Sequence, residues 1–277
     1  MKKLLLLTAL LAALIGTTAT AQQRLVRLTR YNGLMITGLS VASGFEVHLE
    51  KSSETKVVVE LSEELESLLN FSMDTGGIVR LSLNSPESRP RFRRKQVAKV
   101  TIYLPTLRWL RVSGGSTIYT NGNFFTRHTD IVLSGGAELK SLELQTNALR
   151  LMCGGASQAS IRGSVGDLHT NVAGASTVNL DLKCHVATVN AEGASNLTLV
   201  GESAEGTFTA SSSARIQADE FSVNHLNVTA SSASAVRVWA IGQLQATATS
   251  ASSIRYRGEP GLFETQASSA ASIRQLD

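Results

Sequence analysis

Carboxylate and imidazole side chains in the second half of the chain have the most obvious catalytic potential. Hydrolysis of a polysaccharide needs two carboxyl groups that converge on one face of the fold. The acidic residues between Asp130 and Glu264 share no common spacing. His169, His185 and His225 occupy three different positions within the repeat described below. The sequence therefore aligns no two of these groups on one face.

Asp219, Glu220 and His225 come closest to an acid–base set because they lie close together in the chain. Charged side chains on a solvent-exposed face explain them better, since a fold that hosts enzymes does not itself confer activity. We therefore expect a protein that is not an enzyme. The alternative is a carbohydrate-active enzyme, either a polysaccharide lyase or a glycosidase.

Cys153 and Cys184 are the two cysteines of the chain. The repeat places them at different phases, whereas stacked partners of a disulfide would share a phase. We interpret both as small buried hydrophobic residues. No histidine lies at ligand spacing from them, and the Gly-Gly-x-Gly-x-Asp motif of calcium-binding repeats is absent from the sequence. The sequence indicates no metal and no cofactor.

The run from Arg89 to Lys95 is rich in basic residues and includes Arg91, Arg93 and Arg94. Such a run could contact acidic lipid headgroups or anionic glycans. A solvated loop between two strands is the simpler interpretation. Nucleic acid is not expected as a partner, because the charge of the rest of the chain is balanced.

Tyr119, Phe124 and Phe125 form a group of aromatic residues near the start of the second half. Exposed aromatic rings could stack on sugar rings, or they could close the end of a hydrophobic core under a loop. The sequence does not separate these two roles. We carry Tyr119, Phe124, Phe125, Arg91, Arg93 and Arg94 forward as candidate ligand-contact residues.

A repeat organises residues 109–277, and each copy consists of small residues followed by an aliphatic one. Anchored on the second small residue, successive copies are 18 to 21 residues apart, which is strong evidence for a solenoid. The anchors are Gly114, Gly135, Gly155, Gly174, Gly193, Ser212, Ser232, Ser250 and Ser269.

Within each copy, apolar and polar residues alternate with a period of two, which is typical of strands rather than helices. The sequence therefore predicts an all-β fold, a parallel β-helix with about 19–21 residues per coil. Stacked coils lie about 4.8 Å apart, so a sharp corner accepts only Gly, Ala or Ser. Because the early anchors are Gly and the later ones Ser, we expect the corner to relax along the axis.

Residues 22–108 have alternating strands but no clear 19-residue motif. We expect a short helix at 62–70 and a hairpin turn at 74–77 between two strands. This β-rich part should shield the first coil. The last coil ends close to Asp277, and an uncovered strand edge there could mediate self-association.

Residues 1–21 have the parts of a secretory signal: two lysines, an apolar run, and the small-x-small pattern Ala19-Thr20-Ala21. The apolar run is too short to span a bilayer, and no later run is long enough. We expect an exported protein with no transmembrane segment after signal removal. With only 17% charged and 43% hydrophobic residues, the chain is neither disordered nor a coiled coil.

The order of these features carries a resemblance. Phe45–Leu49 and Val57–Val59 precede a Pro105–Gly115 segment, which is followed by repeated Ser-Gly-Gly and Gly-Ala-Ser coils. Over residues 34–277, this resembles the head GIN domain family, described as "putative auto-transporter adhesin", of Gram-negative envelopes. The resemblance implies a right-handed β-helix and an exported location. It implies almost nothing about activity and supplies no functional residues.

We expect a non-enzymatic envelope or cell-surface protein that presents an elongated face to a glycan or a surface protein. A purely structural periplasmic protein is a further alternative. The location would be the periplasm or the outer-membrane surface and extracellular space, and the sequence does not distinguish between them.

Overall fold

The computed structural model describes residues 24–84 and 96–276. The predicted signal segment, Asp277, and the candidates Arg91, Arg93 and Arg94 lie outside these residues. The described chain is all-β apart from one short helix, α2 (Glu63–Glu66), which is shorter than the helix expected over residues 62–70. Among the described residues, no helix has both the length and the apolar character needed to cross a membrane.

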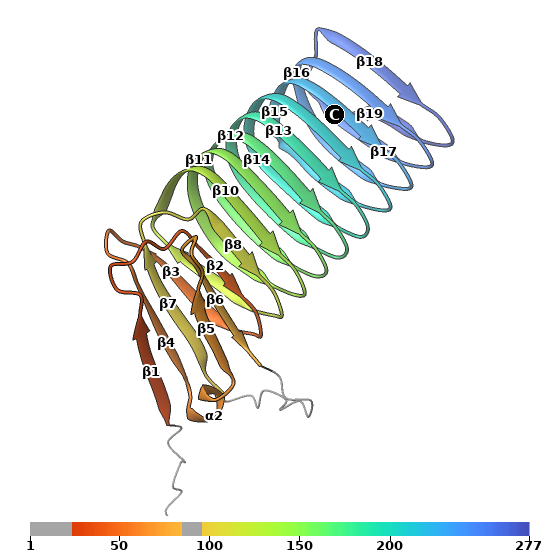
Figure 1. Ribbon diagram of the computed structural model, residues 1–277. Helices are drawn as coiled ribbons and strands as arrows, with labels where there is room; N and C mark the ends of the chain where they lie inside the picture. The colour runs from red at the N-terminus through yellow and green to blue at the C-terminus, as the bar shows by residue number, and fades with distance from the viewer. Residues whose placement is uncertain (1–23, 85–95, 277) are drawn as a thin grey trace, which may run out of the picture.

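The strands form one continuous stack, which runs from β1 at one end to β18 at the other (Figure 1). Their bounds are β1 (Leu25–Arg30), β2 (Gly38–Val41), β3 (Glu46–Lys51), β4 (Lys56–Ser62), β5 (Leu69–Met73), β6 (Ile78–Leu83), β7 (Ala98–Leu104), β8 (Trp109–Val112), β9 (Thr117–Asn121), β10 (Asn123–Leu133), β11 (Glu138–Cys153), β12 (Gln158–Val172), β13 (Thr177–Ala191), β14 (Asn196–Ala210), β15 (Arg215–Ala230), β16 (Ala235–Ala248), β17 (Ser253–Arg257), β18 (Leu262–Ala267) and β19 (Ser272–Gln275).

From β8 onward, each strand pairs in parallel with the equivalent strand of the next coil. The register confirms the repeat read from the sequence, because Ala159 pairs with Val178 and Val178 pairs with Leu197. The predicted parallel β-solenoid is thus the fold of this protein. The aliphatic positions of the repeat point inward and are buried along the whole stack, apart from Ile273 in the last coil. Removing this ladder from water stabilises the fold.

The tight turn of each coil coincides with the small residues of the repeat. Gly174 has φ 71°, and a Cβ there would lie 2.6 Å from the carbonyl oxygen of Gly155 in the preceding coil. The stacked backbones therefore exclude larger side chains, as expected. The corner does not relax along the axis, however, because Ser232 (φ 53°) and Ala233 (φ 61°) keep the left-handed conformation without glycine.

Two coils precede residue 109 in the chain, and sequence reasoning did not detect them. β2 and β3 flank a tight turn at Ser43 and Gly44 and stack in parallel on β8 and β9. On their other side, β2 and β3 pair with β6 and β7. The coil made by β2 and β3 is therefore inserted between two coils that come later in the chain.

Antiparallel strands cover the N-terminal end of the stack. β4 pairs with β7, β1 pairs with β4, and β5 pairs with β6. The turn at 74–77 joins β5 and β6, which confirms the predicted hairpin. These strands shield the first coil.

No strand of the described residues covers the opposite end. Among these residues, β18 pairs only with β16, and β19 only with β17. All six residues of β18 are exposed, including Leu262 (65%) and Phe263 (50%). The final coil thus leaves an open strand edge and the end of the core in contact with solvent.

Candidate ligand-binding face

One outward position on the strand after each tight turn recurs from coil to coil along the solenoid. We call this row the central column. Its members are His48, Tyr119, Lys140, Ser160, Asn179, Thr198, Gln217, Arg237, Arg255 and Arg274. His48 pairs in register with Tyr119, and the members from Ser160 to Arg274 pair coil by coil, whereas the register shifts next to Lys140. At about 4.8 Å per coil, the row from Tyr119 to Arg274 is roughly 40 Å long. The solenoid thereby places residues far apart in sequence on one flat face.

An aromatic pair begins the central column. The rings of His48 and Tyr119 stack with centroids 5.0 Å apart and an angle of 16° between their planes. Tyr119 is 39% exposed. His48 Nε2 lies 2.7 Å from Glu46 Oε1, and this contact fixes the imidazole against the strand. The pair is a rigid, solvent-facing ring surface of the kind that packs against a sugar face.

Lys140 comes next in the column, and its ammonium group donates a hydrogen bond to Glu138. This hydrogen bond raises the pKa of Lys140 above its usual value. The ammonium group therefore stays charged beside Tyr119 over the physiological pH range.

The other two aromatic candidates have different environments. Phe125 is 53% exposed, and Lys51 Nζ lies 5.9 Å from the centroid of its ring. Phe124 is fully buried and pairs in register with Leu144. The prediction that Phe124 contacts a ligand is wrong, because its position faces the core. Phe124 lies six residues after Ile118, beyond the exposed Gly122, and faces the core as Ile118 does.

The structure does not assemble Asp219, Glu220 and His225 into a site. Asp219 lies in a register shift between β15 and β16, Glu220 pairs with Val200, and His225 pairs with Glu205. Within residues 24–84 and 96–276, no group of three His, Cys, Asp or Glu side chains could hold a metal ion.

Comparison with known proteins shows which family the chain belongs to. The family profile described as "putative auto-transporter adhesin, head GIN domain" matches residues 36–199 and 167–260. The chain belongs to this family. Its description is that of exported proteins. A search of the curated proteins finds no match for this head GIN chain.

Solved structures share the fold of this head GIN chain. A crystal structure titled as a putative adhesin from Parabacteroides merdae ATCC 43184 has a TM-score of 0.70 at 14% identity. It covers 92% of this chain and 98% of its own. A putative adhesin from Parabacteroides distasonis ATCC 8503 has a TM-score of 0.68 at 17% identity, with the same coverage. A third structure, titled as a putative lipid binding protein from the same strain, scores 0.61 at 15% identity, again with the same coverage. At these identities the likeness shows the fold alone.

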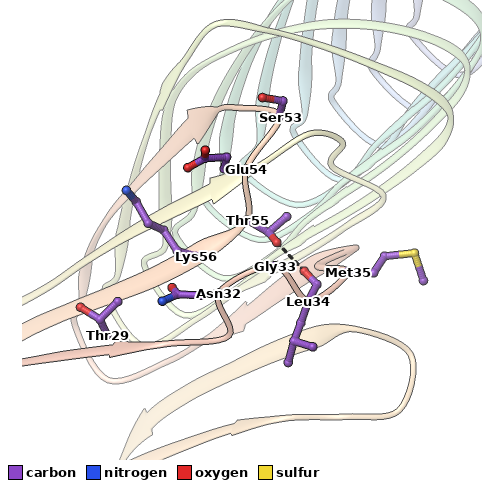
Figure 2. Close-up of a pocket in the computed structure, with 9 residues that line it drawn as sticks. All are labelled: Thr29, Asn32, Gly33, Leu34, Met35, Ser53, Glu54, Thr55 and Lys56. Carbon is purple, nitrogen blue, oxygen red and sulfur yellow. Dashed lines mark hydrogen bonds between the residues drawn. The ribbon is translucent and has the colours of Figure 1, made fainter.

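The head GIN chain also has a large hollow near its N-terminal end, between the β1–β2 loop and the β3–β4 turn (Figure 2). Its volume is about 810 Å³. Thr55 Oγ1 donates a 2.6 Å hydrogen bond to the carbonyl oxygen of Leu34. Figure 2 shows Leu34 and Met35 pointing away from Glu54 and Lys56. Polar side chains, including Glu54 and Lys56, line much of the hollow, but no aromatic ring lines it. The central column, which has a ring surface, is therefore the stronger candidate.

A further hollow of about 590 Å³ lies along the strands that precede the tight turns. Met152 and Cys153 help to line its apolar part. The side chain of Asn190 donates a 3.0 Å hydrogen bond to that of Asn171, which uses part of their polar capacity within the protein. No aromatic ring or basic side chain lines this hollow. Ring stacking and charge thus favour the central column.

The two cysteines of the head GIN chain are free, with Cys153 buried and Cys184 half-buried. They occupy different register positions, since Cys153 pairs with Val172 and Cys184 with Val165. Burial raises the pKa of both thiols to about 12. Thiols of this kind are inert packing residues at neutral pH. This agrees with their interpretation as small hydrophobic residues.

Proposed function

We propose that this protein is a non-enzymatic envelope protein that binds a glycan along the central column. The observation that carries the proposal is the stack of the half-buried His48 ring on the exposed Tyr119 ring, which begins a row of hydrogen-bonding side chains. Sugar rings have apolar faces that pack on aromatic rings, and their hydroxyl groups pair with side chains such as Ser160, Asn179 and Thr198. Membership in an adhesin family supports a binding role.

The binding test uses a panel of neutral and acidic polysaccharides: dextran, polygalacturonate and heparin. Tyr119→Ala should weaken binding to the polysaccharide that the protein recognises by several-fold, because an aromatic contact contributes about 1 kcal/mol. Met152→Ala is the matched control, since Met152 is also exposed but lies on the strand before the tight turn. Equal affinity of the two variants would place the site elsewhere. If the protein binds none of these polysaccharides, the result would contradict a glycan ligand and favour a surface protein as the partner.

The absence of catalysis is part of the proposal. Incubation of the protein with each polysaccharide should release no reducing ends and no unsaturated products. Release of either product would instead support the alternative, a polysaccharide lyase or glycosidase.

The location also belongs to the proposal, which places the exported protein in the cell envelope. Protease treatment of intact cells, followed by blotting beside a periplasmic control, distinguishes two positions. Digestion of this protein alone would place it on the outer surface. Protection until the outer membrane is breached would place it in the periplasm and contradict a role in adhesion.

A further inference from the structure

Three arginines occupy successive coils at the C-terminal end of the central column. Arg237 pairs in register with Arg255, and Arg255 pairs with Arg274. All three side chains are exposed. Like charges in directly paired strand positions destabilise a sheet. This arrangement therefore has a cost that the fold itself does not explain.

Acidic side chains of the described chain do not offset this charge. Among residues 24–84 and 96–276, no ion pair involves Arg237, Arg255 or Arg274. Other surface arginines do have acidic partners, such as Arg162, whose guanidinium lies 2.9 Å from Glu143. The arginine end of the column is thus an uncompensated positive strip.

A hollow of about 280 Å³ lies within this strip, and Arg215 joins Arg237 and Arg255 in lining it. The lining contains no acidic residue. The Arg215 guanidinium donates a 3.2 Å hydrogen bond to the side chain of Asn196, which orients it along the face. Guanidinium groups form bidentate hydrogen bonds with planar carboxylates and with sulfate or phosphate oxygens. The chemistry of the hollow is that of an anion site.

A second hollow of about 210 Å³ lies on the same face in earlier coils, where Ser160, Asn179 and Thr198 of the central column line it. Arg162 and Asp181 beside the column also line this hollow. Within the column, neutral hydroxyl and amide groups precede the arginines, and Lys140 and the Tyr119 ring lie beyond them. A ligand that spans the row meets the Tyr119 ring and the Lys140 ammonium group, then neutral hydrogen-bonding groups, then the arginines.

We propose that the central column binds an acidic polysaccharide along the solenoid axis, with carboxylate or sulfate groups on Arg237, Arg255 and Arg274. This inference rests on the proposed glycan-binding function and specifies its ligand class. A polysaccharide fits better than a lipid surface, because neutral hydrogen-bonding side chains rather than apolar anchors adjoin the arginines. The regular repeat of the coils suits a ligand that is itself a repeating chain.

The experiment compares the affinity of the full-length exported protein for polygalacturonate, heparin, dextran and inorganic polyphosphate. The variant carries Arg237→Gln, Arg255→Gln and Arg274→Gln together. Its control carries Arg108→Gln, Arg111→Gln and Arg150→Gln, which remove the same charge on or beside the strands that precede the tight turn. Circular dichroism of both variants checks folding.

The expected result is a loss of about tenfold or more in affinity for one acidic polysaccharide in the column variant, and little change in the control. The polymer that binds more tightly shows whether the column prefers carboxylate or sulfate groups. The single substitution Arg255→Lys, which keeps the charge but removes bidentate pairing, should weaken binding less than Arg255→Gln.

If both triple variants lost the same affinity, the effect would come from net charge alone, and the proposal would be overturned. Polyphosphate binding as tight as that of the acidic polysaccharides, with the same dependence on the three arginines, would also overturn it. Binding to dextran that depends on Tyr119, without binding to either acidic polymer, would refute the acidic ligand and leave the proposed function intact. Binding to none of the four polymers would refute both.

Discussion

At the tight turns, the anchor residue changes from glycine to serine along the solenoid but keeps a positive φ in every coil. In the last four coils, both central residues of the turn have positive φ, the pattern of a type I′ turn, although none is glycine. Ala233 (φ 61°) and Ala270 (φ 61°) have no polar side chain to compensate for this conformation. The stacked hydrogen bonds between neighbouring turns, such as that from the Ala233 amide to the Ser250 carbonyl, hold it in place.

Replacing these alanines by glycine should stabilise the protein. The left-handed conformation costs an alanine about 1–2 kcal/mol, and glycine removes this cost. Part of the resulting stabilisation is lost, because glycine also makes the unfolded chain more flexible. We expect Ala233→Gly to raise the free energy of unfolding by about 0.5–1 kcal/mol, measured by urea denaturation.

The matched control is Ala175→Gly. Ala175 follows its anchor Gly174 just as Ala233 follows Ser232, but Ala175 does not have positive φ. Glycine should therefore destabilise the protein at this site by roughly 0.5–1 kcal/mol. A change of the same sign in both variants would contradict the role assigned to backbone strain.

At the same scale, Phe124 shows how far the sequence alone reaches. The inward position of every aliphatic anchor follows from its fixed place in the repeat. Phe124 lies outside the repeated motif, near Gly122, so its direction depends on whether alternation continues past that residue. In the structure Gly122 is exposed and interrupts the alternation, yet Phe124 faces the core. The stacking of Tyr119 on His48 was not predictable, because it joins two coils whose adjacency is set by the chain path.

At the scale of elements, the order in which the chain visits the coils explains why the sequence did not reveal the first two. Residues 42–44 have the small-residue character of a tight turn, but the strand before them pairs with residues 78–81 on one side and 109–112 on the other. A repeat is recognised by constant spacing along the chain. The antiparallel strands β4 and β5 interrupt this spacing before β6 and β7 return to the stack.

The open final coil gives a prediction for assembly. β18 exposes a strand edge and the end of the core, so concentrated protein should self-associate there. Light scattering of the wild type should show a dimer, and Phe263→Lys should shift the population toward monomer. Phe125→Lys, at a similarly exposed aromatic residue far from this end, should leave association unchanged. A wild type that is strictly monomeric at high concentration would refute the prediction.

At the scale of the whole molecule, the buried thiols link stability to alkaline pH. An exposed thiol has an ordinary pKa of 9.0, whereas Cys153 and Cys184 have pKa values of about 12 in the folded protein. Above pH 9 the unfolded chain releases protons that the folded protein retains. The contribution of the two buried thiols to the free energy of unfolding is thus complete below pH 9 and is lost as the pH rises toward 12.

Between pH 9 and pH 11, each thiol should lower the free energy of unfolding by about 1.4 kcal/mol per pH unit. The measurement is urea denaturation at several pH values for the wild type and for the double variant Cys153→Ala with Cys184→Ala. The variant should start from a lower stability, because the substitutions leave cavities, but its stability should decline less steeply with pH. Parallel slopes would show that the thiols do not titrate differently in the two states.

The inserted coil has a mechanical consequence. Among the described strands, a force on the C-terminal end is resisted first by the hydrogen bonds of β19 with β17 and of β18 with β16. The coils can therefore detach there one after another. A force on the N-terminal end reaches β2 and β3, which are bonded to coils on both sides. Two interfaces must then break together. When the two ends are pulled apart, the C-terminal coils should therefore detach at a lower force than the coil made by β2 and β3.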